Sequence, residues 1–214
     1  MGYSLMIAPF DFAGHQKIAA RQFFDSYAFF ELTPKQAKEY FLWYMDEIPN
    51  RLALLWEYMK QERPTTEPFD YSPESLLPLW EWYEPKIQQV PMTAKEIESR
   101  VKKFPKYLES EIRKNTKKFT DETLSIALDI SMYLGEVVVK NYPHLRWNYR
   151  TRPKREISVY RPVIDGLNHK MTFETSRVLF VLMLKSAKEQ DSMRLYNLYQ
   201  HWASKYFIPV KAQK

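Results

Sequence analysis

The segment from Thr120 to Asn141 constrains the fold more than any other part of the chain. It contains no proline, and its first residues, Thr120, Asp121 and Glu122, form the pattern of a helix N-terminus. At about 100° per residue, most of its charged residues fall in one narrow stripe, and apolar side chains cover most of the remaining circumference. A helix with so little polar surface needs neighbours on several sides. We therefore predict one central, mostly buried helix over this segment.

Glycine is rare in this chain, and its positions carry information. Gly135 lies inside the predicted central helix, where glycine costs about 1 kcal/mol relative to alanine, so we expect a close helix crossing there. The other glycines stand at positions 2, 14 and 166. No glycine-rich loop is therefore present to cradle a phosphate group, which argues against nucleotide-dependent enzymes of the common folds.

Directly after the central helix, the sequence changes to a pattern typical of strands. Residues 145–150 alternate between apolar and polar side chains, and residues 157–164 form a second candidate strand. Residues 151–155 would join the two as a polar loop. Because two strands alone are only marginally stable, this hairpin must pack on helices or pair with the N-terminal segment.

The predicted hairpin region carries an unusual share of the positive charge. Between residues 140 and 161 there are seven Lys or Arg and one acidic residue, an excess of 7 − 1 = 6, equal to the net charge of the whole chain. Cations interleaved with aromatic rings suit phosphate contacts and base stacking. The alternative is a solubilising loop in which one or two arginines pair with carboxylates of the core. The candidate binding residues are Arg146, Trp147, Tyr149, Arg150, Arg152, Lys154, Arg155 and Arg161.

Two carboxylates on the central helix are the best candidates for catalysis. Asp129 and Glu136 lie two turns apart on one face, with Tyr133 between them. Acid–base catalysis uses two such groups held in different environments, so the pair could serve a hydrolase. Two other interpretations remain: an arginine, Arg146 or Arg161, neutralises them as a structural ion pair, or the face is turned to water.

Signatures of metal, cofactor and nucleophile chemistry are missing from the sequence. The chain has no cysteine, and its four histidines, at 15, 144, 169 and 201, are scattered. Only Asp11 and His15 have a ligand-like i, i+4 spacing, and there is no HExxH or GxSxG motif. We therefore expect no metal and no cofactor.

The sequence favours a soluble, cytoplasmic protein without a membrane segment. Its start lacks a basic region followed by an apolar run, and the longest purely apolar run, Val178 to Leu184, is too short to span a bilayer. The absence of cysteine fits a reducing compartment.

The remaining segments predict a mainly α (α+β) fold, a multi-helix globular domain with a small β-hairpin after the central helix. We expect a single domain over residues 1–214, with a possible edge strand at 3–7 and its 34 aromatic residues supplying a large core. The other predicted helices span residues 15–31, 34–48, 50–61, 72–84, 94–115, 172–187 and 192–206.

Residues 126–164, with LDISMYLGEVVVKNYP followed by RW and then RPV, resemble small uncharacterised bacterial or phage proteins. This resemblance implies a bacterial or phage origin and no particular activity. From the residues themselves, we expect a non-enzymatic cytosolic interaction protein whose basic, aromatic hairpin binds an acidic protein or a nucleic acid. Toxin neutralisation or phage defence would fit such a protein. The alternative is a hydrolase that uses Asp129 and Glu136.

Overall fold

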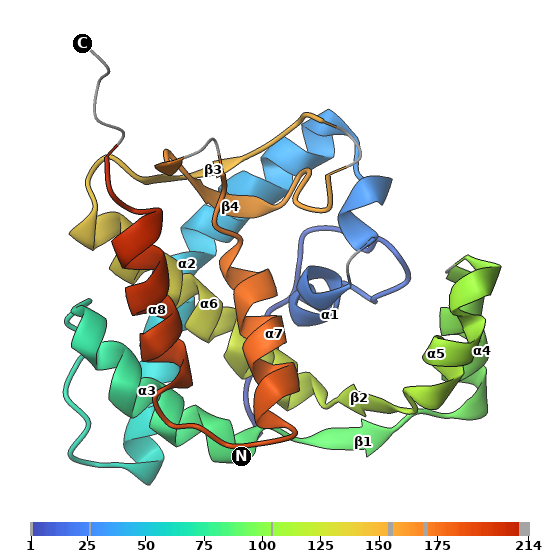
Figure 1. The fold of residues 1–214 in the computed structure, drawn as a ribbon, viewed down its shortest axis with the longest axis horizontal. Helices are drawn as coiled ribbons and strands as arrows, with labels where there is room; N and C mark the ends of the chain where they lie inside the picture. The colour runs from blue at the N-terminus through green and yellow to red at the C-terminus, as the bar shows by residue number, and fades with distance from the viewer. Residues whose placement is uncertain (1, 26, 104, 154–155, 169–170, 210–214) are drawn as a thin grey trace.

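Helix α6 (Asp121–Asn141) runs through the middle of the structure, with other helices on several sides (Figure 1). The Thr120 hydroxyl accepts a hydrogen bond from the backbone N–H of Thr123, so the predicted N-cap is present. Residues 125–135 are buried without interruption, and the whole circumference of the helix is therefore covered. This confirms the prediction of a central helix. The structure is a computed structural model that describes residues 2–25, 27–103, 105–153, 156–168 and 171–209.

Five further helices build the body around α6. Three of them pack directly on it: α1 (Ala19–Phe24), α2 (Pro34–Glu62) and α7 (Thr175–Ser186). The other two, α3 (Leu76–Tyr83) and α8 (Arg194–Lys205), pack on each other. Short 3-10 turns lie between the helices, at η1 (Ala28–Glu31), η2 (Pro73–Ser75), η3 (Glu84–Lys86) and η4 (Lys106–Leu108).

Helix α2 is longer than the sequence predicts. It begins at Pro34, as expected, with a capping box between Thr33 and Gln36, but it continues through Pro49 to Glu62. A proline removes one N–H donor and normally breaks or kinks a helix. Here the face that carries Ile48 and Leu52 is buried on both sides of Pro49, and this packing holds the two halves in one helix. The predicted break at Pro49 is therefore wrong.

The N-terminal segment is less regular than expected. The predicted edge strand at residues 3–7 is reduced to a single bridge between Ile7 and Ile18. The predicted helix over 15–31 is replaced by the short α1 and by η1. Gln16 and Lys17 have φ values of 52° and 61°, which are incompatible with a right-handed helix, so α1 cannot begin before them.

The predicted hairpin is present, with a later second strand. β3 (Arg146–Tyr149) pairs antiparallel with β4 (Pro162–Asp165), so that Trp147 lies opposite Ile164. Residues 157–161 are expected in the second strand but form turns and bends, apart from an isolated bridge between Val159 and Arg150. Tyr160 among them has a φ of 64°, which interrupts an extended strand.

A second small sheet carries an extension that the sequence did not predict. β1 (Gln89–Pro91) and β2 (Lys117–Phe119) form an antiparallel ribbon, and α4 (Ala94–Lys103) and α5 (Glu109–Lys114) stand on its outer end. Figure 1 shows this unit, residues 89–119, projecting from the body, and we call it the arm. The predicted helix over residues 94–115 is thus divided, and the turn between α4 and α5 contains Pro105.

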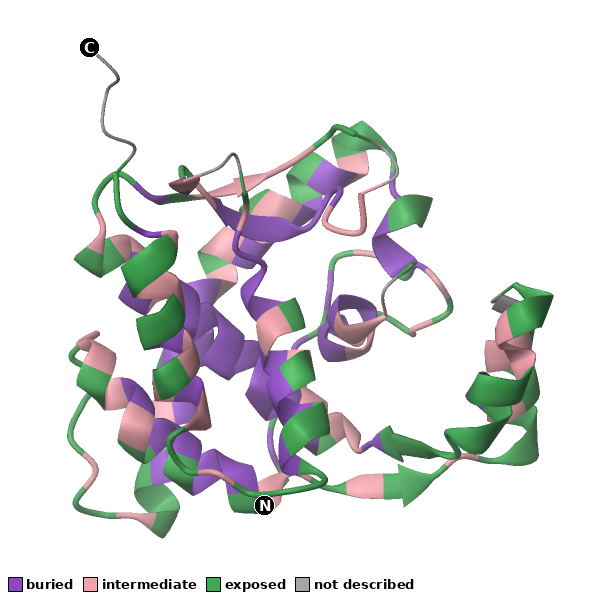
Figure 2. Cartoon of the chain, in the orientation of Figure 1, coloured by how far each residue is buried: buried purple, intermediate pink, exposed green. Residues whose placement is uncertain are grey.

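One hydrophobic cluster fills the body, from Tyr3 to Phe207. Of the described residues between 89 and 118, none belongs to it, and Figure 2 shows the arm as mostly exposed. The fold is thus mainly helical, as predicted, with two small antiparallel sheets where one hairpin was predicted. Within the described chain, no helix combines the length and the apolar character needed to cross a membrane.

Candidate anion-binding surface

The hairpin places two candidate cations on the surface. Arg146, at the start of β3, and Arg152, in the loop after it, are exposed. Arg150 is partly buried, and its guanidinium lies 3.3 Å from a carboxylate oxygen of Asp165 and 3.9 Å from one of Glu156. The charge of Arg150 is therefore balanced within the protein. Lys154 and Arg155 lie outside the described residues. We call Arg146 and Arg152 the hairpin surface.

The aromatic residues of the hairpin attach it to the body. The Trp147 indole N–H donates a hydrogen bond of 2.9 Å to Glu136, and its ring lies against Gly135 of α6. A Cβ atom at Gly135 would stand 2.0 Å from a carbon of that ring. The close approach expected at this glycine is therefore made by an indole and not by a helix.

Tyr149 has a similar attaching role. Its ring centroid lies 5.0 Å from that of Phe41 on α2. Of the three hairpin rings proposed for stacking, Trp147 and Tyr149 thus already contact the protein and are only partly exposed, and Tyr160 is buried. The arginines are left as the external groups of the hairpin.

Arg161 lies in the core and not on the hairpin surface. It is 2% exposed, donates a hydrogen bond of 2.6 Å to the Phe23 carbonyl oxygen and another to the Asp25 carbonyl oxygen, and lies 3.3 Å from the Glu174 carboxylate. Burial lowers the pKa of Arg161 and raises the pKa of Glu174, because each charge is removed from water. From the sequence, Arg161 is expected among the external binding residues. The structure corrects this, because the partners of Arg161 lie inside the protein.

The two candidate catalytic carboxylates have different environments and different partners. Asp129 is 0% exposed and accepts hydrogen bonds of 3.0 Å and 2.7 Å from Arg51 and a further one from the Tyr3 hydroxyl. Burial raises the pKa of Asp129 to about 6, although these hydrogen bonds oppose the rise. Glu136 is partly buried and binds Trp147. A substrate has no access to Asp129 in this arrangement.

Arg51 is the residue that sequence reasoning missed. The predicted partners of the carboxylates were Arg146 and Arg161, whereas the observed partner comes from α2. Arg51 also donates a hydrogen bond of 2.8 Å to the Ser4 carbonyl oxygen. It therefore joins the N-terminal segment, α2 and α6 in one buried network. An arginine beside Ile48, Leu52 and Leu55 on an apolar helix face was the available signal.

The histidines form no metal centre in the described part of the chain. His15 lies 2.9 Å from Asp25, and not with Asp11 as the i, i+4 spacing suggested. Among the residues that the structure describes, no group of three or more His, Cys, Asp or Glu side chains is arranged to hold a metal ion.

The arm is a second basic element. Residues 89–119 contain nine Lys or Arg and four Glu, an excess of 9 − 4 = 5. Acids and bases alternate along its helices, but the bases outnumber the acids. With a net charge of +6, of which the region from 140 to 161 carries +6 and the arm +5, the rest of the chain carries −5. Along the sequence the positive charge is thus concentrated in two segments, although Arg150 and Arg161 of the first pair with Asp165 and Glu174, which lie outside it.

Comparison with known proteins gives no assignment. No protein-family model matches the chain, and no match is found among the curated proteins or the solved structures. The resemblance of residues 126–164 to small bacterial or phage proteins stays a prediction. Any function assigned to this chain therefore rests on its own residues.

Proposed function

We propose that this chain is a non-enzymatic cytosolic protein that binds an anionic macromolecule, an acidic protein or a nucleic acid, through the hairpin surface. The observation that carries the proposal is the exposure of Arg146 and Arg152 on a hairpin whose other described arginines, Arg150 and Arg161, already pair with carboxylates of the protein. An anionic partner gains Coulomb energy from such a surface and is attracted to it over distances near the Debye length.

The attachment of the hairpin supports this function. Trp147 and Tyr149 fix β3 on α6 and α2, and the Arg150 contacts with Asp165 and Glu156 hold the strand exit in place. Cations on a fixed backbone lose less conformational entropy when they bind than cations on a mobile loop. The contacts of Trp147, Tyr149 and Arg150 therefore hold the backbone that carries Arg146 and Arg152 in place before a partner binds.

The hydrolase alternative has less support. Its first carboxylate, Asp129, has no exposed surface and already binds Arg51 and Tyr3. Its second, Glu136, binds an indole of the same hairpin. Groups used in this way stabilise the fold, and neither is available to a substrate as an acid–base pair.

Charge reversal tests the hairpin surface. We expect the double variant Arg146→Glu, Arg152→Glu to bind a short oligonucleotide or a polyglutamate peptide about tenfold more weakly at low salt, because two attractive contacts become repulsive. Fluorescence anisotropy with labelled probes at about 50 and 200 mM salt measures this loss.

The matched control is Lys185→Glu, Lys188→Glu, which makes the same charge change on exposed residues at and just beyond the end of α7. This control should bind nearly as the unchanged protein does. If the unchanged protein binds neither probe at low salt, or if both double variants lose affinity equally, the hairpin surface is not the binding site.

A further inference from the structure

We propose that the arm is a second contact element and that it binds single-stranded nucleic acid, with Tyr107 stacking on a base. This inference deepens the proposed function, and rests on it, because it names the anionic partner. Its own observations concern a different part of the chain, namely the projection of the arm, its surplus of cations and one exposed ring.

The position of the arm suits a contact element. The ribbon of β1 and β2 connects it to the body, and α4 packs mainly on α5 (Figures 1 and 2). Its described residues outside Phe119 do not enter the hydrophobic cluster of the body. Most described residues of the arm are exposed or partly exposed, so an extended ligand can approach it without displacing the core.

The charges of the arm leave cations over after internal pairing. All four glutamates of the arm lie next to a cation: Glu98 and Glu109 pair with Arg113, Glu111 with Lys114, and Glu96 with Lys118. Three of the nine cations therefore contact all four acids, and six cations remain against one uncompensated negative charge. Of the remaining ones, Lys95, Lys102, Lys106 and Lys117 are exposed.

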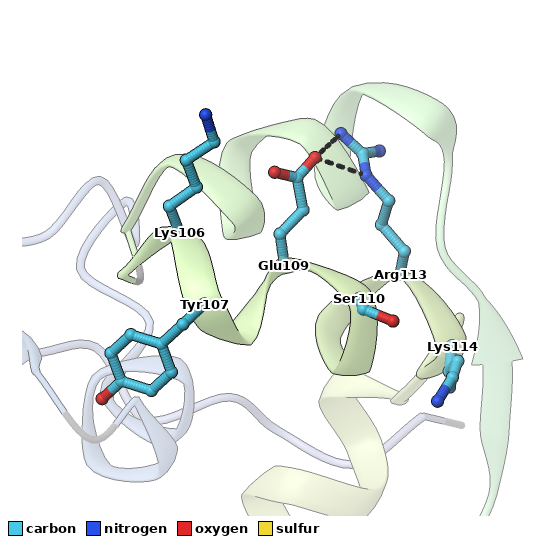
Figure 3. A pocket seen from close by; sticks show the side chains of 6 residues that line it. All are labelled: Lys106, Tyr107, Glu109, Ser110, Arg113 and Lys114. Atoms are coloured by element: carbon cyan, nitrogen blue, oxygen red, sulfur yellow. Dashed lines mark hydrogen bonds and ion pairs between the residues drawn. The ribbon is translucent and has the colours of Figure 1, made fainter.

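Tyr107 provides an exposed aromatic ring, which the described part of the hairpin lacks. It is 82% exposed, whereas Trp147 and Tyr149 are used to attach the hairpin. Figure 3 shows Tyr107 and Lys106 extending from the turn at the start of α5, beside the Glu109–Arg113 pair. These residues, with Ser110 and Lys114, line an open hollow of about 600 Å³. A ring, an exposed lysine and a glutamate paired with Arg113 thus border one hollow.

This combination favours a single strand over other anions. Base stacking on an aromatic side chain requires an unpaired base, because the faces of duplex bases are already stacked. An acidic peptide would contact the lysines but has no base to stack on the exposed tyrosine. A single-stranded nucleic acid uses both groups at once.

Substitution of Tyr107 in the full chain tests the inference. We expect Tyr107→Ala to weaken binding of a short single-stranded oligonucleotide about tenfold, and Tyr107→Phe to bind as the unchanged protein does, because stacking needs the ring and not the hydroxyl. Tyr196→Ala, on α8, is the control and should keep full affinity. The slope of log affinity against log salt should stay the same in Tyr107→Ala, since no cation is removed.

The contribution of Lys102 and Lys106 is measured separately, through the salt dependence of binding. In Lys102→Gln, Lys106→Gln the salt slope should fall by about 0.7 for each phosphate group that the protein no longer neutralises. If Tyr107→Ala binds the oligonucleotide as the unchanged protein does, the arm inference is wrong, whatever the hairpin variants do. Binding to polyglutamate but not to the oligonucleotide also overturns it and leaves an acidic protein as the partner. If no anionic probe binds at all, the arm inference and the proposed function both fail.

Discussion

Replacing Arg51 by methionine is expected to lower the free energy of unfolding by about 3–5 kcal/mol. The substitution removes both hydrogen bonds from Arg51 to Asp129 and the one to the Ser4 carbonyl oxygen. It leaves the Asp129 carboxylate buried at 0% exposure with the Tyr3 hydroxyl as its remaining side-chain partner. The large loss arises from this uncompensated charge, and urea unfolding followed by circular dichroism measures it.

The pH dependence of the Arg51→Met variant gives a second signature. Burial already holds the pKa of Asp129 near 6 in the presence of Arg51, and loss of the cation raises that pKa further. A carboxyl whose folded pKa exceeds its unfolded value, about 4, loses stability as the pH rises between the two. The variant should therefore be less damaged at pH 5 than at pH 8.

Arg21→Met is the matched control for Arg51→Met. Arg21 also makes two hydrogen bonds to one carboxylate, of 2.7 Å and 2.6 Å to Asp121, but both side chains are 37% exposed. Its loss should cost about 0–1 kcal/mol. Adding Asp129→Leu to Arg51→Met should restore stability, because no buried charge remains. An Arg51→Met variant as stable as Arg21→Met would contradict a structural role for the buried pair.

Gly135→Ala is expected to lower the free energy of unfolding by about 2 kcal/mol. Overpacking of a filled site costs about 1–3 kcal/mol, and a Cβ at 2.0 Å from the Trp147 ring belongs at the upper end. Alanine gains about 1 kcal/mol over glycine in helix propensity, which offsets part of this cost. Thermal unfolding and the change in near-ultraviolet circular dichroism of Trp147 report the displacement of the ring.

The double variant Gly135→Ala, Trp147→Leu supplies the control for this clash. With the indole removed, alanine at position 135 should be neutral or favourable relative to Trp147→Leu alone, so the two substitutions couple strongly in a double-mutant cycle. Equal effects of Gly135→Ala with and without the indole would show that the ring is not the cause. The same cycle tests whether the hairpin lies on α6 as described.

Local signals were sufficient to predict α6. The Thr120 cap, the acidic first turn and the apolar circumference all lie within the segment itself, and the helix begins and ends where they place it. The partner of Asp129 could not be predicted in the same way, because Arg51 is 78 positions away and only the tertiary fold brings them together. The prediction of a helix break at Pro49 was wrong for a related reason, because the buried packing of α2 outweighed the local tendency of proline to break a helix.

The candidate site was likewise predictable only in part. The sequence shows where positive charge accumulates in the hairpin, but not which arginines are exposed: Arg146 is exposed, whereas Arg161 is buried against Glu174. The sequence also does not predict the arm, because β1 and β2 have three residues each and no alternating pattern. Pairing partners of individual charges depend on contacts between distant segments, which composition cannot supply.

Hydrogen–deuterium exchange with and without a short single-stranded oligonucleotide is the most direct test of the central claim, that the two basic elements face an anionic partner. The account predicts slower amide exchange in residues 146–152 of the hairpin and 94–114 of the arm, and unchanged exchange in α8. Slower exchange in α8 with none in the hairpin, or no change anywhere at low salt, would contradict it.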